Sequence, residues 1–321
     1  MTRDLIKDAL LGVAVGDAIG VPVEFRHRED LERNPLTGMT GFGTHHQPPG
    51  TWSDDSSLTF CLAEMLCGEY DLANLANRFI NWKNHGYWTP HGSIFDIGIA
   101  TRAAIGRLEK GLSPVEAGGK EESSNGNGSL MRILPLLFYV RDNSMEQRFE
   151  RTKEVSSLTH RHPRSIIACF LYLEIALDLI NGQSPYDAYR HACRNCVNFL
   201  KTHYPAFEKE DIYFARLLAG NIFELREKDI QSSGYVIHTL EASIWCLLNT
   251  RNYADAVLKA ANLGDDSDTT AAVTGGLAGL LYGHEKMPVE WLEVLVRRAD
   301  IEDLSRRLGN KLNKKWQEHS R

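Results

Sequence analysis

The sequence has no long apolar run, and this absence excludes a helix that crosses a membrane. Such a helix needs about 18 or more consecutive apolar residues, and charged side chains interrupt every apolar stretch of this 321-residue chain well before that length. The first residues also lack the apolar segment of a secretory signal peptide, because Asp4, Lys7 and Asp8 occur within it. We therefore expect a cytoplasmic protein without a membrane partner.

An excess of positive charge is absent as well. The formal net charge is -6, whereas proteins that bind nucleic acid usually carry a basic surface, so no nucleic-acid partner is expected. Strand-like alternation is scarce, and no Gly-x-Gly-x-x-Gly follows a strand, which argues against a dinucleotide-binding sheet. Of the six cysteines, only Cys193 and Cys196 form a Cys-x-x-Cys pair. Because a structural zinc site needs four ligands, we interpret both as ordinary helix residues.

Helical periodicity fills most of the chain. Apolar residues recur every three or four positions, most clearly in segments 6–13, 58–66, 166–177 and 236–247. The Asn-Gly pair at 181–182 and Gly264 are helix-stop signals. No segment has the length and composition of a linker. The sequence therefore predicts a single all-α domain over residues 1–321, a helical bundle around a cleft formed by loops and helix ends.

Two short acidic clusters precede apolar helical segments. Residues 51–56 read Thr-Trp-Ser-Asp-Asp-Ser, and residues 264–269 read Gly-Asp-Asp-Ser-Asp-Thr. Two aspartates and one hydroxyl from each cluster would give an oxygen-only site for two hard cations such as Mg²⁺ or Mn²⁺. The alternative is helix capping, since Ser, Thr and Asp are favoured at helix N-termini. Spacing alone leaves both interpretations open.

A third segment, residues 16–24, reads Gly-Asp-Ala-Ile-Gly-Val-Pro-Val-Glu. With Gly12 before it, Gly16 and Gly20 allow this helix to approach another backbone closely. Glu24 then follows in a loop, where it can be a general base, a substrate clamp or a solvated charge.

Two further loops carry polar side chains. Residues 125–132 read Asn-Gly-Asn-Gly-Ser-Leu-Met-Arg. Glycines admit positive φ, so this loop can form an anion-binding nest suited to a pyrophosphate, or it can be a plain turn. His160 and His162 stand two residues apart and can bind metal or titrate, although such pairs are usually structural.

Taken together and in this order, these segments resemble the ADP-ribosylglycohydrolase family. The family pattern runs Gly-Asp-Ala-x-Gly-x-Pro-x-Glu, Thr/Ser-Asp-Asp, an Asn-Gly loop ending in Met-Arg, Thr-His and Gly-x-Asp-x-Asp-Thr. The matching segments in this sequence are 16–24, 53–55, 127–132, 159–160 and 264–269. Residues 234–245 also resemble the helix before the last motif. The resemblance extends over roughly residues 8 to 283.

The resemblance implies an all-α domain with a binuclear Mg²⁺ or Mn²⁺ site. The metal ligands that it implies are Ser53, Asp54, Asp55, Asp266, Asp268 and Thr269. Ser53 occupies a position that is often Thr. Asp265 is an additional acid that we do not count as a ligand.

The resemblance also implies the substrate, an ADP-ribosylated protein or ADP-ribose. Phe-Asp-Ile-Gly at 95–98 is similar to a motif of the arginine-directed bacterial branch, where the aspartate faces a guanidinium. Asp96 is therefore expected to select arginine as the acceptor, unless it is merely a helix cap after Ser93. The expected reaction is metal-dependent removal of ADP-ribose from a side chain, with two ions about 4 Å apart orienting the ribose hydroxyls and activating a water.

Individual roles follow from the same resemblance. The residues expected to be catalytic are Glu24, Asp55, Asp96 and Asp266. Those expected to bind the substrate are Glu24, Asp96, Asn127, Gly128, Ser129, Met131 and His160.

Two alternatives stay open. One is a catalytically silent ADP-ribose-binding or structural relative, such as the lens crystallins of this fold, which the intact ligand set disfavours. The other is a binuclear hydrolase acting on a free ADP-ribose derivative or on serine-linked ADP-ribose.

Overall fold

The computed structural model describes residues 3–319, with side chains as far as residue 313. Over this range the chain is helical and contains no β-strand, only two isolated bridges. The α-helices are α1 (Leu5–Gly20), α2 (Arg28–Arg33), α3 (Asp54–Leu66), α4 (Leu72–His85), α5 (Ile99–Glu109), α6 (Leu136–Val140), α7 (Met145–Ser157), α8 (Pro163–Ile180), α9 (Pro185–His203), α10 (Phe207–Leu218), α11 (Val236–Leu248), α12 (Tyr253–Ala261), α13 (Ser267–Tyr282), α14 (Val289–Val294) and α15 (Arg298–His319). Short 3₁₀ turns are η1 (Val21–Val23), η2 (Pro114–Glu116), η3 (Glu122–Ser124), η4 (Ile222–Glu224), η5 (Glu227–Asp229) and η6 (His284–Lys286). The expected all-α fold class is confirmed.

Local signals in the sequence account for several helix ends. Helix α8 ends at Ile180, and Gly182 follows with a φ of 86°. Gly264, after α12, has a φ of 79°. Glycine adopts this left-handed conformation at little steric cost, so both predicted stop signals are confirmed. No described helix combines the length and apolar composition that a membrane crossing requires.

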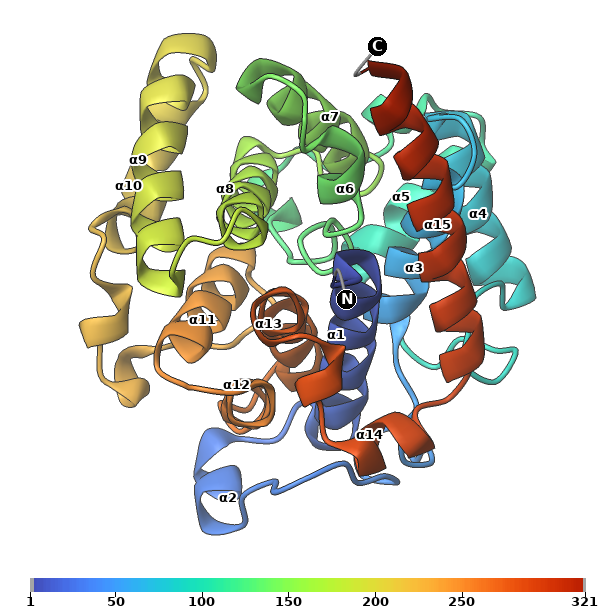
Figure 1. Cartoon of the computed structure of the whole chain (residues 1–321), viewed down its shortest axis with the longest axis vertical. Helices are drawn as coiled ribbons and strands as arrows, with labels where there is room; N and C mark the ends of the chain where they lie inside the picture. The colour runs from blue at the N-terminus through green and yellow to red at the C-terminus, as the bar shows by residue number, and fades with distance from the viewer. Residues whose placement is uncertain (1–2, 320–321) are drawn as a thin grey trace.

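Helices α1 and α13 lie side by side at the centre of the molecule, although they come from opposite ends of the chain (Figure 1). Small residues make this close packing possible. A Cβ atom on Gly16 would lie 2.1 Å from the carbonyl oxygen of Ala271, and one on Gly20 would lie 2.3 Å from the Cα of Asp268. The close backbone approach predicted for the 16–24 segment is therefore present, and it brings the end of α1 to the start of α13.

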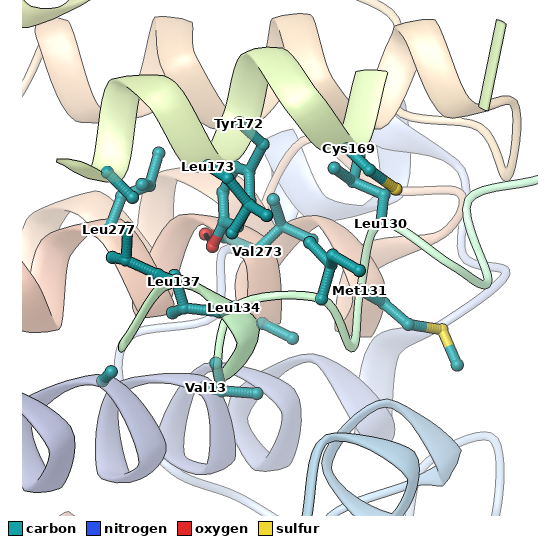
Figure 2. Packing of buried hydrophobic residues seen from close by; sticks show 14 of the residues in the cluster. Val13, Leu130, Met131, Leu134, Leu137, Cys169, Tyr172, Leu173, Val273 and Leu277 are labelled. Atoms are coloured by element: carbon teal, nitrogen blue, oxygen red, sulfur yellow. Dashed lines mark hydrogen bonds between the residues drawn. The ribbon is translucent and has the colours of Figure 1, made fainter. Parts of the chain in front are cut away.

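The hydrophobic core surrounds this central pair. Figure 2 shows side chains of α1, α8, α13 and the segment before α6 meeting in one cluster. The Tyr172 hydroxyl donates a hydrogen bond of 3.0 Å to the carbonyl of Val273, which ties α8 to α13. The two cysteines of the Cys-x-x-Cys pair are buried in α9 as free thiols, as expected for ordinary helix residues.

Candidate active site

The two acidic clusters meet where the end of α1 faces the first turns of α3 and α13. Ser53 Oγ donates a hydrogen bond of 2.9 Å to Asp55 Oδ2, and Thr269 Oγ1 donates one of 3.3 Å to the same oxygen. The second bond joins residues 214 positions apart in the chain. The hydroxyls of both clusters therefore converge on one carboxylate.

Asp17 lies beneath this junction and has no predicted role from the sequence, although it is part of the 16–24 motif. Its buried carboxylate accepts hydrogen bonds from the backbone N–H of Ser53 (2.9 Å) and of Ser56 (3.0 Å), and from the Ser56 hydroxyl (2.6 Å). A carboxylate from α1 therefore caps the N-terminus of α3, where the helix dipole favours negative charge. The only signal in the sequence is a charged residue in the second half of α1, where all other residues are small or apolar.

Helix capping and the candidate metal ligands occupy the same segments. Ser53 caps α3 by accepting a hydrogen bond of 3.2 Å from the Asp55 N–H. Asp266 is the first flanking residue of α13 and makes no side-chain capping bond. The Asp266 carboxylate therefore does not cap α13.

Two groups of three carboxylates are close enough to hold a cation. Asp17, Asp55 and Asp268 form one group, and Glu24, Asp266 and Asp268 form the other. Within each group the oxygen atoms lie within 4.8 Å of one another. Asp268 belongs to both groups, so two ions here would be neighbours. An all-oxygen donor set of this kind suits a hard cation such as Mg²⁺ or Mn²⁺.

The electrostatics of the cluster also fit a cation. Burial, and then the neighbouring carboxylates, raise the pKa of Asp55 and Asp268 well above the usual range. Burial raises the pKa of Asp17 to about 6, against the lowering effect of its hydrogen bonds. Asp55 Oδ1 is buried and has no hydrogen-bond partner among the described residues. Buried carboxylates are normally paired or bound to metal, so this donor set is suited to a divalent ion.

Glu24 is 4% exposed, which excludes the interpretation of a solvated charge. Its carboxylate pairs with the His45 imidazole, while Thr44 Oγ1 donates a hydrogen bond of 2.6 Å to its backbone carbonyl. Burial raises the pKa of Glu24 to about 7, and the bond to Glu24 raises the pKa of His45. His45 also contacts the ring of Phe95, at 5.2 Å between centroids. His45 is a second residue that the sequence did not single out, and it connects Glu24 to the segment that carries Asp96.

A cleft of about 400 Å³ opens above the carboxylates. The predicted residues that line it are Glu24, Asp54, Asp96, Asn127, Gly128, Met131, His160, Asp266 and Thr269. Ser53, Asp55 and Asp268 are buried and do not line it.

Asp54 and Asp96 lie together in one wall of the cleft. Asp54 is in neither carboxylate group. Burial raises its pKa well above the usual range, and the charge of Asp96 raises it further. Helix α5 begins at Ile99 with Gly98 as its N-cap, so Asp96 does not cap that helix. The cleft therefore has an acidic wall that pairs Asp96 with Asp54, one of the metal ligands that the resemblance implies.

The 125–132 loop forms another wall, but not through the backbone conformation that we expected. Neither Gly126 nor Gly128 has a positive φ. Gly128 is instead required by close packing, because a Cβ there would lie 2.8 Å from His160 Cε1. Asn127 Nδ2 donates hydrogen bonds to Asp266 Oδ2 (2.7 Å) and Thr239 Oγ1 (2.9 Å), which fixes the loop against the acidic cluster.

Two further residues of this region differ in how they face the cleft. The Ser129 hydroxyl is fully buried, accepts a hydrogen bond of 2.9 Å from Ser156 and does not line the cleft. Its side chain is thus placed for packing rather than for substrate contact. His160 does line the cleft, and burial lowers its pKa to about 3. It therefore presents a neutral ring at physiological pH.

Comparisons with known proteins show which family this chain resembles. The sequence model of the ADP-ribosylglycohydrolase family matches residues 1–318. The chain is 37% identical to the ADP-ribosylarginine hydrolase Tri1 of Serratia proteamaculans, over 95% of this chain and 79% of that protein. It is 27% identical to the ADP-ribosyl-[dinitrogen reductase] glycohydrolase of Rhodospirillum rubrum, over 94% and 93% of the two chains. A solved structure described as an ADP-ribosylglycohydrolase-related protein complex superposes with a TM-score of 0.79 at 29% identity, covering 96% of this chain and 98% of that one.

Proposed function

We propose that this chain, which belongs to the ADP-ribosylglycohydrolase family, hydrolyses the N-glycosidic bond between ADP-ribose and an arginine side chain of a modified protein. The observation that carries the arginine specificity is the carboxylate of Asp96 in the wall of the cleft, next to Asp54. Two relatives named as ADP-ribosylarginine hydrolases, at 36% and 37% identity, support the same choice. We further propose that residues 1–321 form a single domain that acts in the cytoplasm.

Asp96 would recognise the leaving group. A guanidinium is planar and cationic and can donate two parallel hydrogen bonds to one carboxylate. A serine-linked substrate offers no positive charge at that position. The preference for arginine would therefore arise from a charge-assisted contact that only one linkage can make.

The candidate metal ligands would be Asp17 and Asp55 on one side, Glu24 and Asp266 on the other, and Asp268 between them. Divalent ions held there would supply Lewis acidity and lower the pKa of a bound water. Compared with the expectation from the sequence, Asp17 and Glu24 are added, and Asp54 is reassigned to the acidic wall. Ser53 and Thr269 would orient Asp55 through the hydrogen bonds described above.

The remaining walls would position the ADP-ribose. Asn127 fixes the loop against Asp266, and Gly128 leaves room beside His160 for a bulky polar group. The neutral His160 ring can accept or donate a hydrogen bond without adding charge. In the reaction the water oxygen bonds to the anomeric carbon, and the guanidine nitrogen leaves with a proton.

Turnover by the wild-type protein is the direct test. We expect release of ADP-ribose from an arginine-modified peptide in Mg²⁺ or Mn²⁺, loss of this activity in a chelator, and much slower release from a serine-modified peptide. Equal or faster turnover of the serine linkage would contradict the arginine assignment. Binding of ADP-ribose without turnover of either peptide would identify a silent relative.

The variant Asp96→Ala tests the assigned contact. Losing one charge-assisted hydrogen-bond partner costs about 1.5–3 kcal/mol, so arginine-linked kcat/KM should fall about ten- to a hundredfold. Metal content and thermal stability should stay at wild-type values, because Asp96 caps no helix and belongs to neither carboxylate group. Unaltered arginine turnover would remove Asp96 from the site.

A further inference from the structure

Two exposed apolar side chains stand among the residues that line the acidic cleft. Ile99 is 91% exposed and Phe25 is 63% exposed. Ile99 is the most exposed large apolar residue among the side chains that the structure describes. We call Phe25 and Ile99 the apolar lip. Phe25 directly follows Glu24, and Ile99 comes three positions after Asp96. Both side chains therefore lie close to residues of the proposed reaction site.

Phe25 combines an exposed side chain with an unusual backbone conformation. Its φ is 63°, a left-handed conformation that is a rare outlier for a bulky residue. The Phe25 N–H donates a hydrogen bond of 2.6 Å to the carbonyl of Asp265, and the Asp265 N–H donates one of 2.9 Å to the carbonyl of Arg26. Asp265 is itself left-handed, with a φ of 54°. The left-handed conformation, which Asp tolerates but a bulky residue rarely adopts, is therefore held on both sides by hydrogen bonds, and the strain at Phe25 is of the kind retained chiefly at functional positions.

Ile99 is presented by a helix end. It is the first residue of α5, directly after Gly98, three positions beyond Asp96. Because Ile99 belongs to the first turn of a helix, its backbone position is fixed. The side chain is therefore held at the edge of the cleft while it stays exposed to solvent. Neither lip residue carries charge, in contrast to the acidic wall beside them.

We propose that the apolar lip binds the protein chain next to the modified arginine, and that it selects carriers with apolar residues flanking that arginine. This inference rests on the proposed function. When the ADP-ribose occupies the cleft and the guanidinium faces Asp96, the neighbouring residues of the carrier lie at the mouth. Removing Phe25 and Ile99 from water there favours association. The acidic wall recognises the arginine, and the lip recognises its apolar neighbours.

The test compares two synthetic peptides with one ADP-ribosylarginine each, flanked by leucine in one and by serine in the other. Free ADP-ribosylarginine is the third substrate. For the wild type we expect a KM about tenfold lower for the leucine-flanked peptide, a difference of about 1.4 kcal/mol. Ile99→Ser should remove most of this difference while kcat stays unchanged. Its kcat/KM on free ADP-ribosylarginine should remain within about twofold of wild type.

Two further variants complete the design. Phe25→Asn keeps the left-handed backbone accessible, because Asn tolerates that conformation, and should likewise reduce the KM difference between the two peptides. Ile212→Ser, at a 72% exposed position on α10 that does not line the cleft, is the matched control and should leave all KM values unchanged.

The proposal is overturned if Ile99→Ser preserves the wild-type difference between the two peptides. It is also overturned if Ile99→Ser slows free ADP-ribosylarginine as much as the peptides, or changes the oligomeric state in gel filtration. Failure of the proposed function can be told apart from failure of the lip proposal, because the wild type would then leave free ADP-ribosylarginine intact.

Discussion

At the scale of single residues, two aspartates three positions apart have opposite environments. Asp268 is 1% exposed and belongs to both carboxylate groups, whereas Asp265 is exposed and belongs to neither. Asp268→Asn removes one negative charge and one oxygen ligand with almost no change in volume. Because changes to outer partners of a metal ligand already cost about 10- to 100-fold in affinity, this variant should weaken Mn²⁺ binding by more than that.

Isothermal titration of the metal-free protein with Mn²⁺ measures this loss. Asp265→Asn is the matched control, since it removes the same charge three positions away and should leave the affinity within a few-fold of wild type. Normal metal stoichiometry in Asp268→Asn would disprove the joint site.

Gly128 matters for a different reason, which is the lack of space for a larger side chain at its position. Valine at this position would place its Cβ within 2.8 Å of the His160 ring and push its methyl groups into the cleft. We expect Gly128→Val to raise the Kd for ADP-ribose by more than tenfold with Mn²⁺ affinity nearly unchanged. Both constants come from calorimetry on the same preparation, and unchanged ADP-ribose affinity would reduce the loop to a simple turn.

At the scale of helices, the site depends on the close contact between α1 and α13. Gly16→Ala would place a methyl group 2.1 Å from the Ala271 carbonyl oxygen, so the two helices would have to separate. Overpacking of this kind costs about 1–3 kcal/mol, and the separation would also displace Asp17. Both the free energy of unfolding and the Mn²⁺ affinity should fall.

The control for this substitution lies in α5. A Cβ on Gly106 meets nothing within 4 Å. Gly106→Ala should therefore leave metal binding intact and stabilise the protein slightly, since glycine is unfavourable inside a helix. A stable Gly16→Ala protein with full metal affinity would refute the close-packing interpretation.

The helices were the most predictable part of this protein, because apolar periodicity and stop signals act locally. The 58–66 and 166–177 patterns became α3 and α8, and the glycines of α1 correctly indicated a close helix contact. Asp17, His45 and the inward direction of Ser129 were not predictable in this way, because each depends on which segment lies opposite. The positive φ expected at Gly128 was wrong, and the structure instead shows that a Cβ there would lie close to the His160 ring.

At the scale of the whole molecule, the buried carboxylates make the free energy of unfolding depend on pH and on bound metal. The pKa of Glu24 rises from 4.5 to about 7 and that of Asp17 from 3.8 to about 6. The folded state therefore holds protons that the unfolded chain has already released. The stability of the metal-free protein should fall as pH rises from about 4 to about 7, by up to about 3 kcal/mol for Glu24 alone.

A bound cation reverses this trend, since it stabilises the ionised carboxylates and binds more tightly as they lose protons. The difference in Tm between samples with Mn²⁺ and with chelator should therefore increase from pH 5 to pH 8. Thermal unfolding at four or five pH values measures it. A difference that is constant or shrinks with pH would contradict the assignment of these carboxylates to the metal site.

The hydrogen bond between Thr269 and Asp55 spans 214 residues, and this separation has a consequence for biosynthesis. A nascent chain on the ribosome can form α1 and α3 early, but it carries only part of the acidic cluster until the start of α13 has emerged. During that interval the carboxylates of Asp17 and Asp55 lack Asp268. Ribosome-bound chains stopped before residue 264 should fail to retain Mn²⁺, so the enzyme becomes able to act only near the end of its own synthesis.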